Sequence, residues 1–308
     1  MEITHKAQKA YRKGGVRHLF NEIWERTVFR SKISYILKQA IGKEQHERLG
    51  MAPLVGYWPD FENPRSFNEK IAYRKLKTNK SCFSTLSDKY LVREYVKERV
   101  GEEYLTDLYH VTDNPETIPF EELPDKFVIK ANHSSGRNRI VTNKSDIDTT
   151  EIKYECRQWL SEDFDGLREY WYTEIKPRIT IEEFLDDDLY EVPLDYKFFV
   201  FDGEVEYVQV DYGRFGAHTR SIYDNNWEEQ PFEYIYPKAP PIDKPDSLEE
   251  MIEVAESLAD NLNFVRVDLF DVEGGGIYFG EMTFAPEGGT GRFQTKEYDF
   301  AVGSHWSI

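Results

Sequence analysis

Two acidic residues near the C-terminal end of the chain, Asp268 and Glu281, stand where a β-hairpin would bring them opposite each other. Residues 264–272 and 277–284 have the composition of strands, and the glycine-rich segment 273–276 between them is a turn sequence. With the loop centred between residues 274 and 275, the two acids are directly opposed, with Cβ atoms about 4.5–5.5 Å apart. Carboxylates at that separation repel, so a shared proton, an arginine or a divalent cation must offset the repulsion.

The same register pairs Val272 with Ile277 and Arg266 with Thr283, so that Arg266 and Thr283 share a face with the two acids. The opposite, core-facing side carries Val265, Val267, Leu269, Met282 and Phe284. A carboxylate pair on a rigid hairpin is a good magnesium site when substrate phosphates complete the shell. Two other interpretations stay open: solvated surface acids paired with Arg266, or a loop shifted by one residue, which would send the acids to opposite faces.

A second candidate is Lys130, which lies in an otherwise apolar strand (126–131) and precedes a polar loop at 133–138. An ammonium group beside a small Gly/Ser-rich loop suits phosphate binding, because the N–H groups of the loop can converge on the oxygens. The segment is not a Walker A motif, and a plain turn between strands is the alternative interpretation. We do not expect His133 to bind a metal, because no second histidine lies at ligand spacing.

The elements that would position these residues mix helices with antiparallel hairpins. Helices are predicted at 15–48, directly after Phe67, at 88–99 (between Ser87 and Gly101 as caps), at 146–160 and at 247–262, with an irregular, proline-containing connector at 51–66. Strands are predicted at 126–131, 139–142, 178–185, 195–201, 204–211, 264–272 and 277–284. Asp202-Gly203 is a strong hairpin signal. This order predicts an α+β fold rather than a parallel doubly wound sheet.

The composition excludes several classes of protein. The chain has 308 residues, of which 40% are hydrophobic and 15% aromatic, as in globular proteins with a sizeable core. It has no apolar run of about 18 residues, no signal-peptide pattern and only two cysteines, which together predict a cytoplasmic protein without disulfides. Residues 1–50 hold eleven basic and five acidic residues, while the chain as a whole has a net charge of −18. The acidic body argues against a nucleic-acid groove.

Taken together, the motifs resemble those of the ATP-grasp superfamily and stand in the same order. The matching segments are Lys130 with its loop, Ile181-Glu182-Glu183-Phe184-Leu185, Asp195-Tyr196-Lys197, Arg266-Val267-Asp268 and Gly280-Glu281-Met282-Thr283. More narrowly, residues 87–99, 127–138, 195–203 and 264–289 resemble the TupA-like ATP-grasp family, which is associated with teichuronopeptide and other surface-polysaccharide biosynthesis. The resemblance implies an ATP-grasp fold, with two α+β lobes gripping the nucleotide after a helical N-terminal segment.

The resemblance also implies residue roles. For ATP, it assigns Lys130 to the α- and β-phosphates, Ser134, Ser135 and Gly136 to a lid loop, Glu182, the adjoining Glu183 and the backbone near Leu185 to the adenine, and Asp195 to the ribose. For the chemistry, it assigns Lys197 to the γ-phosphate and the acyl phosphate, Arg266 to the developing oxyanion, and Asp268 and Glu281 to one or two Mg²⁺ ions. The third metal ligand of the superfamily is an asparagine, and its position here holds Thr283, a poorer ligand.

The activity implied is that of a carboxylate–amine ligase, which forms an amide through an acyl phosphate. We expect Arg214 and Arg220 to grip the acceptor carboxylate, with surface arginines as the alternative, and residues 287–289 to border the amine site, with a plain turn as the alternative. The predicted substrates are a small-molecule or glycan carboxylate, of uronic-acid or amino-acid type, and an amine. The alternatives are a glycan kinase on the same fold and a nucleotide-binding scaffold of a polysaccharide assembly complex.

We divide the sequence into a basic arm and connector (1–60), a part with the nucleotide lid (61–184) and a metal-binding lobe (185–308). The arm carries an apolar stripe at Leu19, Phe20, Ile23, Trp24 and Val28. It can dock on the acidic body, rest on an anionic membrane surface or hold an assembly partner.

We predict that deleting residues 1–30 leaves ATP binding intact, because the nucleotide motifs all follow residue 60. Isothermal titration of ATP into the truncated chain checks this. A large loss of affinity would show that the arm belongs to the nucleotide site.

Overall fold

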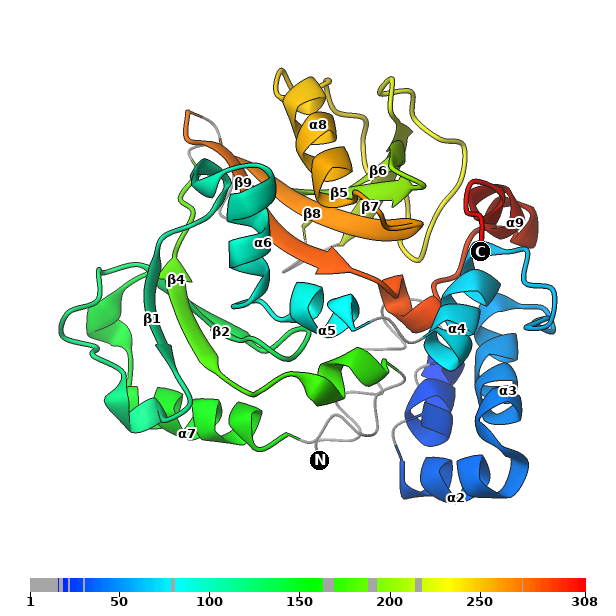
Figure 1. Ribbon diagram of the computed structural model, residues 1–308, viewed down its shortest axis with the longest axis horizontal. Coiled ribbons are helices and arrows are strands. Elements are labelled where there is room, and N and C mark those ends of the chain that lie inside the picture. Colours follow the sequence, from blue (N-terminus) through cyan, green and yellow to red (C-terminus); the bar gives the residue numbers. More distant parts are fainter. Residues whose placement is uncertain are drawn as a thin grey trace. The chain divides into compact units, whose positions relative to one another are not determined.

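The strands of the computed structural model form two antiparallel sheets, of four and five strands, accompanied by helices (Figure 1). The structure describes residues 16, 19–21, 23–29, 31–78, 81–162, 169–187, 193–213, 218–272 and 274–308. Helices mixed with antiparallel sheets confirm the predicted α+β class. Within the described ranges, no helix is long and apolar enough to cross a bilayer.

The chain divides into two compact units. The first unit comprises Met1–Thr78, Asp165–Glu169 and Ala285–His305, and the second comprises Asn79–Phe164, Tyr170–Phe284 and Trp306–Ile308. Both sheets therefore belong to the second unit, as do all predicted site residues except 287–289, which lie in the first. The division into 1–60, 61–184 and 185–308 stays a prediction.

The four-stranded sheet has the order β1-β4-β2-β3. Its strands are β1 (Leu108–Thr112), β2 (Phe127–Ala131), β3 (Asn138–Val141) and β4 (Ile179–Glu183). Helix α7 (Thr149–Leu160) buries Ile152, Cys156 and Trp159 in one cluster with the apolar side chains of β2 and β4. The alternation of β2 leaves Lys130 out of that core.

The five-stranded sheet has the order β7-β6-β5-β8-β9. Its strands are β5 (Leu194–Phe201), β6 (Glu204–Tyr212), β7 (Thr219–Asp224), β8 (Phe264–Val272) and β9 (Gly276–Thr283). Asp202 and Gly203 both have positive φ and join β5 to β6 in the predicted hairpin. Helix α8 (Leu248–Leu258) contacts β5, β6 and β8 and buries Met251, Val254 and Ala255.

The first unit is helical. It holds α2 (Lys32–Ile41), α3 (Lys43–Val55), α4 (Phe67–Lys77), the short 3₁₀ helix η6 (Pro286–Gly289) and α9 (Lys296–Ser304). The predicted helix after Phe67 is α4, which Ser66 and Glu69 begin with a reciprocal capping box. Asp299 of α9 accepts hydrogen bonds from the backbone and side-chain nitrogens of Asn68 and from Tyr57, and burial raises its pKa to about 6.

The prediction of one long helix over 15–48 was wrong. The helical residues 23–29 are followed by Ser31, which caps α2, and Gly42, with a φ of 81°, separates α2 from α3. The connector predicted at 51–66 begins too early, because α3 continues through Pro53 to Val55. Met51 and Val55 are buried with Phe61 and Ala72, and this packing outweighs the proline's missing hydrogen bond.

The helix predicted from Asp88 also differs. Helix α6 starts later, at Val92, and ends at Arg99 as expected, and an unpredicted helix, α5 (Cys82–Ser87), precedes it. The Asp88 carboxylate accepts hydrogen bonds from the backbone of Tyr90 and Leu91 and so forms a turn where the helix was expected.

The register of the β8–β9 hairpin differs from the prediction near the turn and agrees with it at the acids. Val272 pairs with Gly276, and not with Ile277, so the loop is shifted by one residue. A bulge at Gly280 then restores the predicted pairs, Asp268 with Glu281 and Arg266 with Thr283. Without the bulge, the shifted loop would put Glu281 on the apolar face.

Glycine suits this bulge because the chain passes close to its partner strand. A Cβ at Gly280 would lie 3.0 Å from the carbonyl oxygen of Asp268 and 3.1 Å from the ring of Phe270. We predict that Gly280→Val lowers the free energy of unfolding by about 1–3 kcal/mol, as overpacking does. It should also increase amide hydrogen exchange across β8 and β9.

Thermal unfolding and hydrogen exchange of the variant test this prediction, with Tyr278→Val on the same strand as the matched control. Native exchange protection of β9 in Gly280→Val would show that the bulge tolerates a side chain.

Candidate functional site

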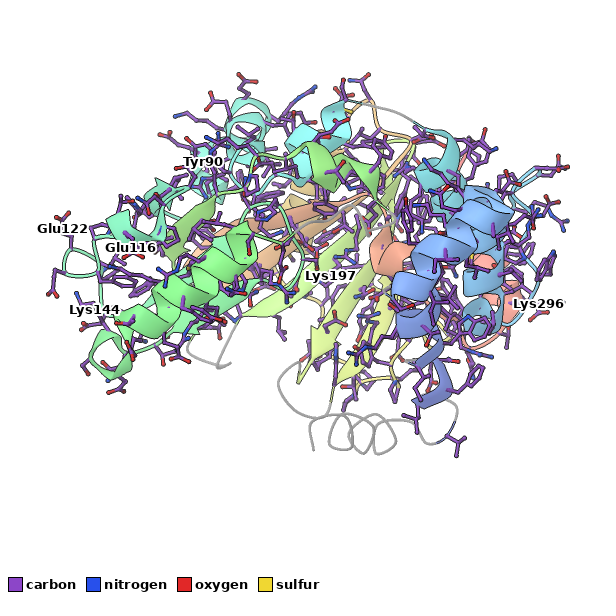
Figure 2. All side chains as sticks on the ribbon, turned by 90° about the horizontal axis from the view of Figure 1, so that it is seen from below. Tyr90, Glu116, Glu122, Lys144, Lys197 and Lys296 are labelled. Carbon is purple, nitrogen blue, oxygen red and sulfur yellow. The ribbon has the colours of Figure 1, made fainter. Side chains whose placement is uncertain are left out.

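One face of the five-stranded sheet carries a row of charged side chains. The alternation of the strands puts Asp195 and Lys197 of β5 beside Arg266 and Asp268 of β8 and, at the sheet's end, Glu281 of β9. All of them but Glu281 are buried. Figure 2 shows Lys197 among these strands. Buried charges are costly unless each is paired, so the pairing defines this site.

Asp268 is the centre of the row. Arg266 donates from Nε to Asp268 Oδ1 (2.6 Å) and from Nη2 to Oδ2 (2.7 Å), a bidentate pair. Lys197 Nζ lies 2.5 Å from Asp268 Oδ2 and 2.5 Å from Asp195 Oδ2. The structure thus brings together four of the residues that the sequence singled out. The repulsion between Asp268 and Glu281 is offset by cations. Arg266 donates to both carboxylates, and Lys197 donates to Asp268.

Glu281 is the exposed end of the row, with 34% of its side chain accessible. Its Oε1 accepts from Arg266 (3.3 Å) and from Thr283 (3.3 Å), and its Oε2 lies 3.4 Å from Lys89 Nζ. Although burial raises the pKa of Glu281, the charges of Lys89, Arg266 and Lys197 lower it to about 2. Glu281 therefore stays ionised, as a metal ligand must be.

Lys89 is a site residue that the sequence analysis missed. It lies just before α6, and its ammonium also donates to the carbonyl of Ser134 (3.0 Å), so it joins the polar loop to the sheet. The residues around Lys89 were interpreted only as the start of a helix over 88–99. The signal that could have found it is a lysine directly after the turn-forming Asp88, at the start of a helix.

The row continues to the other edge of the sheet through Asp211 of β6 and Arg220 of β7. Arg220 donates from Nε to Asp211 Oδ1 (2.6 Å) and from Nη2 to Oδ2 (3.2 Å), and its guanidinium lies over the rings of Tyr234 and Tyr236. His218 Nε2 lies 3.2 Å from Asp211 Oδ1. Arg220 is buried, so it is not the surface arginine of the alternative interpretation. Asp211 and His218 were not predicted.

The second candidate site lies on the four-stranded sheet. Lys130 Nζ donates to Glu182 Oε2 (2.7 Å), and Thr180 and Thr106 donate to the same carboxylate. Burial raises the pKa of Glu182, but the charge and hydrogen bond of Lys130, with smaller contributions from Thr180 and Arg93, lower it overall. The neighbouring Glu183 points elsewhere and accepts from the backbone of Asp107. Lys130 and Glu182 are thus a tight pair across β2 and β4.

The loop after Lys130 is held at its base and is open at its tip. The Asn132 side chain donates to Asp88 and Lys176 and accepts from Arg178, and Ser134 beside it is buried. Ser135 and Gly136 are exposed, and Gly136 has a φ of 72°. His133 contacts Asn132 and the carbonyl of Trp159, which is a structural role. A tight base and a free tip suit a loop that covers a ligand.

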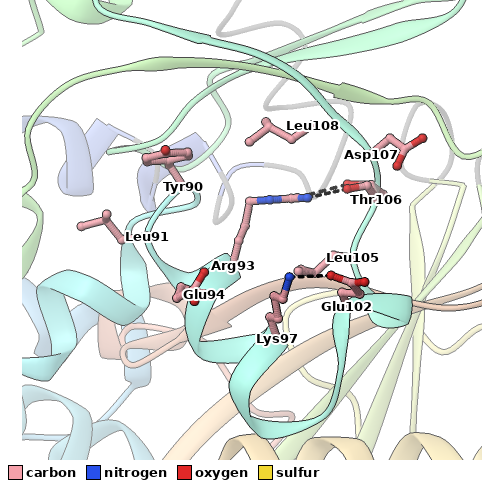
Figure 3. Close-up of a pocket in the computed structure, with 10 residues that line it drawn as sticks. All are labelled: Tyr90, Leu91, Arg93, Glu94, Lys97, Glu102, Leu105, Thr106, Asp107 and Leu108. Atoms are coloured by element: carbon pink, nitrogen blue, oxygen red, sulfur yellow. Dashed lines mark hydrogen bonds and ion pairs between the residues drawn. The ribbon is translucent and has the colours of Figure 1, made fainter.

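A pocket of about 560 Å³ opens between α6 and the start of β1 (Figure 3). Arg93 points across it and donates to the carbonyl of Thr106 (2.5 Å), and Lys97 pairs with Glu102 (2.5 Å). None of the predicted site residues lines the pocket. Its link to the charged groups is Thr106, whose hydroxyl donates to Glu182 (3.4 Å).

The donor set at the hairpin fits a hard cation. Asp268, Glu281 and the hydroxyl of Thr283 supply only oxygen atoms, which magnesium prefers. Within the part of the chain that the structure describes, no group of three His, Cys, Asp or Glu side chains forms a metal site by itself. A cation here would therefore need oxygen atoms from a ligand as well.

Three remaining predictions have different outcomes. Arg214 lies outside the described residues. Leu185 follows β4 and belongs to no helix or strand. Residues 287–289 form part of η6 in the first unit, and Gly288 accepts a hydrogen bond from Lys75. The proposed functions of all these residues stay predictions.

The pair on the four-stranded sheet yields a test. We predict that Lys130→Met lowers the free energy of unfolding at pH 7 by about 3 kcal/mol, because it leaves the Glu182 carboxylate buried without its cation. In the variant the pKa of Glu182 rises, so protonation relieves the penalty and stability recovers as the pH falls from 7 to 5. Wild type, in which Lys130 lowers this pKa, shows no such recovery from Glu182.

Chemical denaturation at several pH values measures the effect, and Lys130→Met/Glu182→Gln is the control. This double variant should be more stable at pH 7 than the single variant and should lack its recovery on acidification. Equal stability of the two at pH 7 would contradict a tight, buried pair.

Comparison with known proteins identifies the family. No curated protein matches the sequence. D-alanine–D-alanine ligase from Bacillus anthracis is 18% identical, with a TM-score of 0.40 over 65% of this chain and 57% of that one. N5-carboxyaminoimidazole ribonucleotide synthetase from Thermotoga maritima is 14% identical, with a TM-score of 0.39 over 66% of this chain and 42% of that one.

The ATP-grasp ligase PsnB, complexed with a phosphomimetic variant of its minimal precursor, Mg and ADP, is 12% identical, with a TM-score of 0.38 over 82% of this chain and 63% of that one. The chain thus spans less than two thirds of the length of these structures. A family model described as TupA-like ATPgrasp matches residues 69–307, well over half of the chain. This match, over the residues that carry both sheets and the charged row, shows that the chain belongs to the TupA-like ATP-grasp family.

Proposed function

We propose that the protein is an ATP- and magnesium-dependent ligase that joins a carboxylate to an amine through an acyl phosphate. The observation that carries the proposal is the charged row, which is buried except at Glu281. In it Lys197, Arg220 and Arg266, together with Lys89 from before α6, pair with Asp195, Asp211, Asp268 and Glu281. A sheet that needed this face only for packing would be more stable with apolar side chains there. Family membership supports ATP as the ligand of the row.

The nucleotide phosphates are the natural partners of Lys130 and Lys89. Lys130 extends from β2, and Lys89 already contacts the backbone of the loop that follows β2, at Ser134. The two cations and the exposed loop tip at Ser135 and Gly136 would contact phosphate oxygens from several sides. In this proposal Glu182 holds Lys130 in place, and the backbone near Leu185 contacts the adenine.

Asp268 and Glu281 would hold the magnesium ion, with Thr283 as a weaker third ligand. When bound, magnesium neutralises charge on the transferred phosphoryl group and draws the phosphates to the sheet. Glu281 contributes an ionised, partly accessible carboxylate, and Asp268 is fixed by Arg266. The donor set that the hairpin provides is therefore suitable for one ion.

The reaction would proceed in two steps. A carboxylate oxygen of the substrate attacks the γ-phosphorus of ATP, and the bond between that phosphorus and the bridging oxygen of the β-phosphate breaks. This step releases ADP and leaves an acyl phosphate on the substrate. An amine then attacks the acyl carbon, phosphate departs with the C–O bond electrons, and the amine loses a proton, which gives an amide. Lys197 and Arg266 stabilise the negative charge that develops in both steps, which requires positioned cations and no protein nucleophile.

For the substrates, we propose a uronic-acid-type sugar or an amino acid as the carboxylate, and an amine, in surface-polysaccharide biosynthesis. Arg220 supports a carboxylate at that edge of the sheet, since its guanidinium is planar, buried and stacked on Tyr236. Binding there requires Arg220 to share its charge between the substrate and Asp211. The proposed ligation would take place in the cytoplasm, where ATP is available.

Hydroxylamine trapping tests the proposal directly. With ATP, magnesium and a panel of uronic acids and amino acids, the protein should release phosphate and form a hydroxamate with at least one acid. Glu281→Gln should lower that rate about 100-fold, since it removes a metal ligand's charge. Glu204→Gln, on the same sheet and exposed, is the matched control and should keep the rate.

Each other outcome has a distinct meaning. A stable phospho-sugar instead of a hydroxamate would identify a glycan kinase. ATP binding with neither product would favour a scaffold. Hydroxamate formation by Glu281→Gln at the wild-type rate would remove Glu281 from the metal site.

A further inference from the structure

The N-terminal helices of the first unit expose an unusual number of large apolar side chains. Of the fourteen such side chains that are exposed among the described residues, six lie between residues 16 and 36: Val16, Phe20, Ile23, Ile33, Tyr35 and Ile36. The other eight are spread over residues 49–308. Scattered apolar side chains are normal on a surface, whereas a concentration of them marks a contact surface.

The apolar stripe predicted from the sequence accounts for only part of this region. Trp24 donates to the carbonyl of Gly50 and packs with Val28, Phe29 and Leu54, so this part is used for packing inside the unit. Phe20 stacks on Trp24 but remains 51% exposed. Intramolecular packing therefore explains the inner side chains of the arm and leaves its outer ones without a function.

Helix α2 shows the same feature most clearly. Its inner side is marked by Ser34, which is buried and contacts His46 of α3. Ile33 and Ile36, three residues apart and hence neighbours on the helix, are 61% and 68% exposed. A helix that only covered α3 would carry polar residues at these positions.

The charge of this region indicates the kind of partner. Residues 16–43 hold six basic residues, Arg17, Arg26, Arg30, Lys32, Lys38 and Lys43, against two acidic ones, Glu22 and Glu25, and no acidic residue lies between Arg26 and Lys43. The whole chain, in contrast, has a net charge of −18. Exposed isoleucines and aromatic side chains among lysines and arginines are the composition of helices that lie on anionic bilayers.

We propose that the described residues between 16 and 43 form an interfacial membrane-binding segment, with α2 lying on a bilayer of anionic lipids through Ile33 and Ile36. The apolar side chains would enter the boundary between headgroups and acyl chains, and Arg26, Lys38 and Lys43 would contact the headgroups. The acidic remainder of the chain would be repelled by the same surface, which limits contact to this segment. The proposal is independent of the ligase activity.

Vesicle flotation with the full chain tests it. At 0.1 M salt we expect at least about tenfold more binding to phosphatidylcholine vesicles with 30% phosphatidylglycerol than to phosphatidylcholine alone. Ile33→Glu/Ile36→Glu should lower binding to the anionic vesicles at least about tenfold. Ile140→Glu/Tyr154→Glu, which makes the same charge change at exposed apolar positions of the second unit, should bind as wild type does.

Two further measurements keep the result interpretable. Thermal unfolding of Ile33→Glu/Ile36→Glu should match wild type, because both side chains are exposed, and loss of binding by a folded variant supports the proposal. Equal binding by this variant, or no preference for anionic vesicles in wild type, would overturn it. Sedimentation showing a dimer that only this variant dissociates, without vesicle binding, would instead assign the surface to a second copy of the chain.

Discussion

The structure around the site depends on one constraint: charges buried on a sheet face must be paired. The five-stranded sheet has an apolar face, and its other face brings Asp268 between Lys197 and Arg266. Each carboxylate of the row has a cation within 3.4 Å or less, and the four acids balance four bases. Such a row gains little stability over apolar residues, because desolvation offsets the attraction. Charged rather than apolar side chains on this face are understandable if the row binds a charged ligand.

The backbone has to meet this constraint as well, and it does so with a bulge. The turn between β8 and β9 sets a register in which Glu281 would fall on the apolar face. Gly280 adds one residue to β9 and returns Glu281 to the side of Asp268. The close approach of Gly280 to the Asp268 carbonyl explains why a residue without Cβ stands there. A glycine within a strand thus positions Glu281 beside Asp268, the two proposed metal ligands.

The sequence predicted seven of the nine strands of the described residues because their signals are local, and it missed β1 and β7, which lie at sheet edges. Alternation and the Asp202-Gly203 turn need no knowledge of the rest of the chain, and the hairpin β5–β6 follows from them. The pairing of Asp268 with Glu281 was predicted correctly, but from a loop register that was wrong and that the bulge at Gly280 compensates. Sequence alone could not reveal this, since a bulge depends on packing between strands.

Contacts between distant segments were the part that could not be predicted. Lys89 and Glu281 form an ion pair although they are 192 residues apart in the sequence, and no local sequence pattern predicts this contact. The break of the arm at Ser31 and Gly42 is similar, because the packing of Trp24 and Phe29 on Gly50 and Leu54 decides where the chain turns. Helical periodicity was recognised, but which side of each helix would be buried depended on α3.

The ion pairs of both candidate sites also affect how a nucleotide would be selected. Lys130 is paired with Glu182 and Lys89 with Glu281, so a ligand must compete with internal carboxylates for both lysines. An anion alone would take Lys89 and leave Glu281 with less of the charge that keeps its pKa near 2. A cation alone would draw Glu281 away and leave Lys89 with only the carbonyl of Ser134, without a carboxylate. Phosphates that arrive with a divalent ion satisfy both sides at once, so the proposed site favours the magnesium complex of the nucleotide over either component.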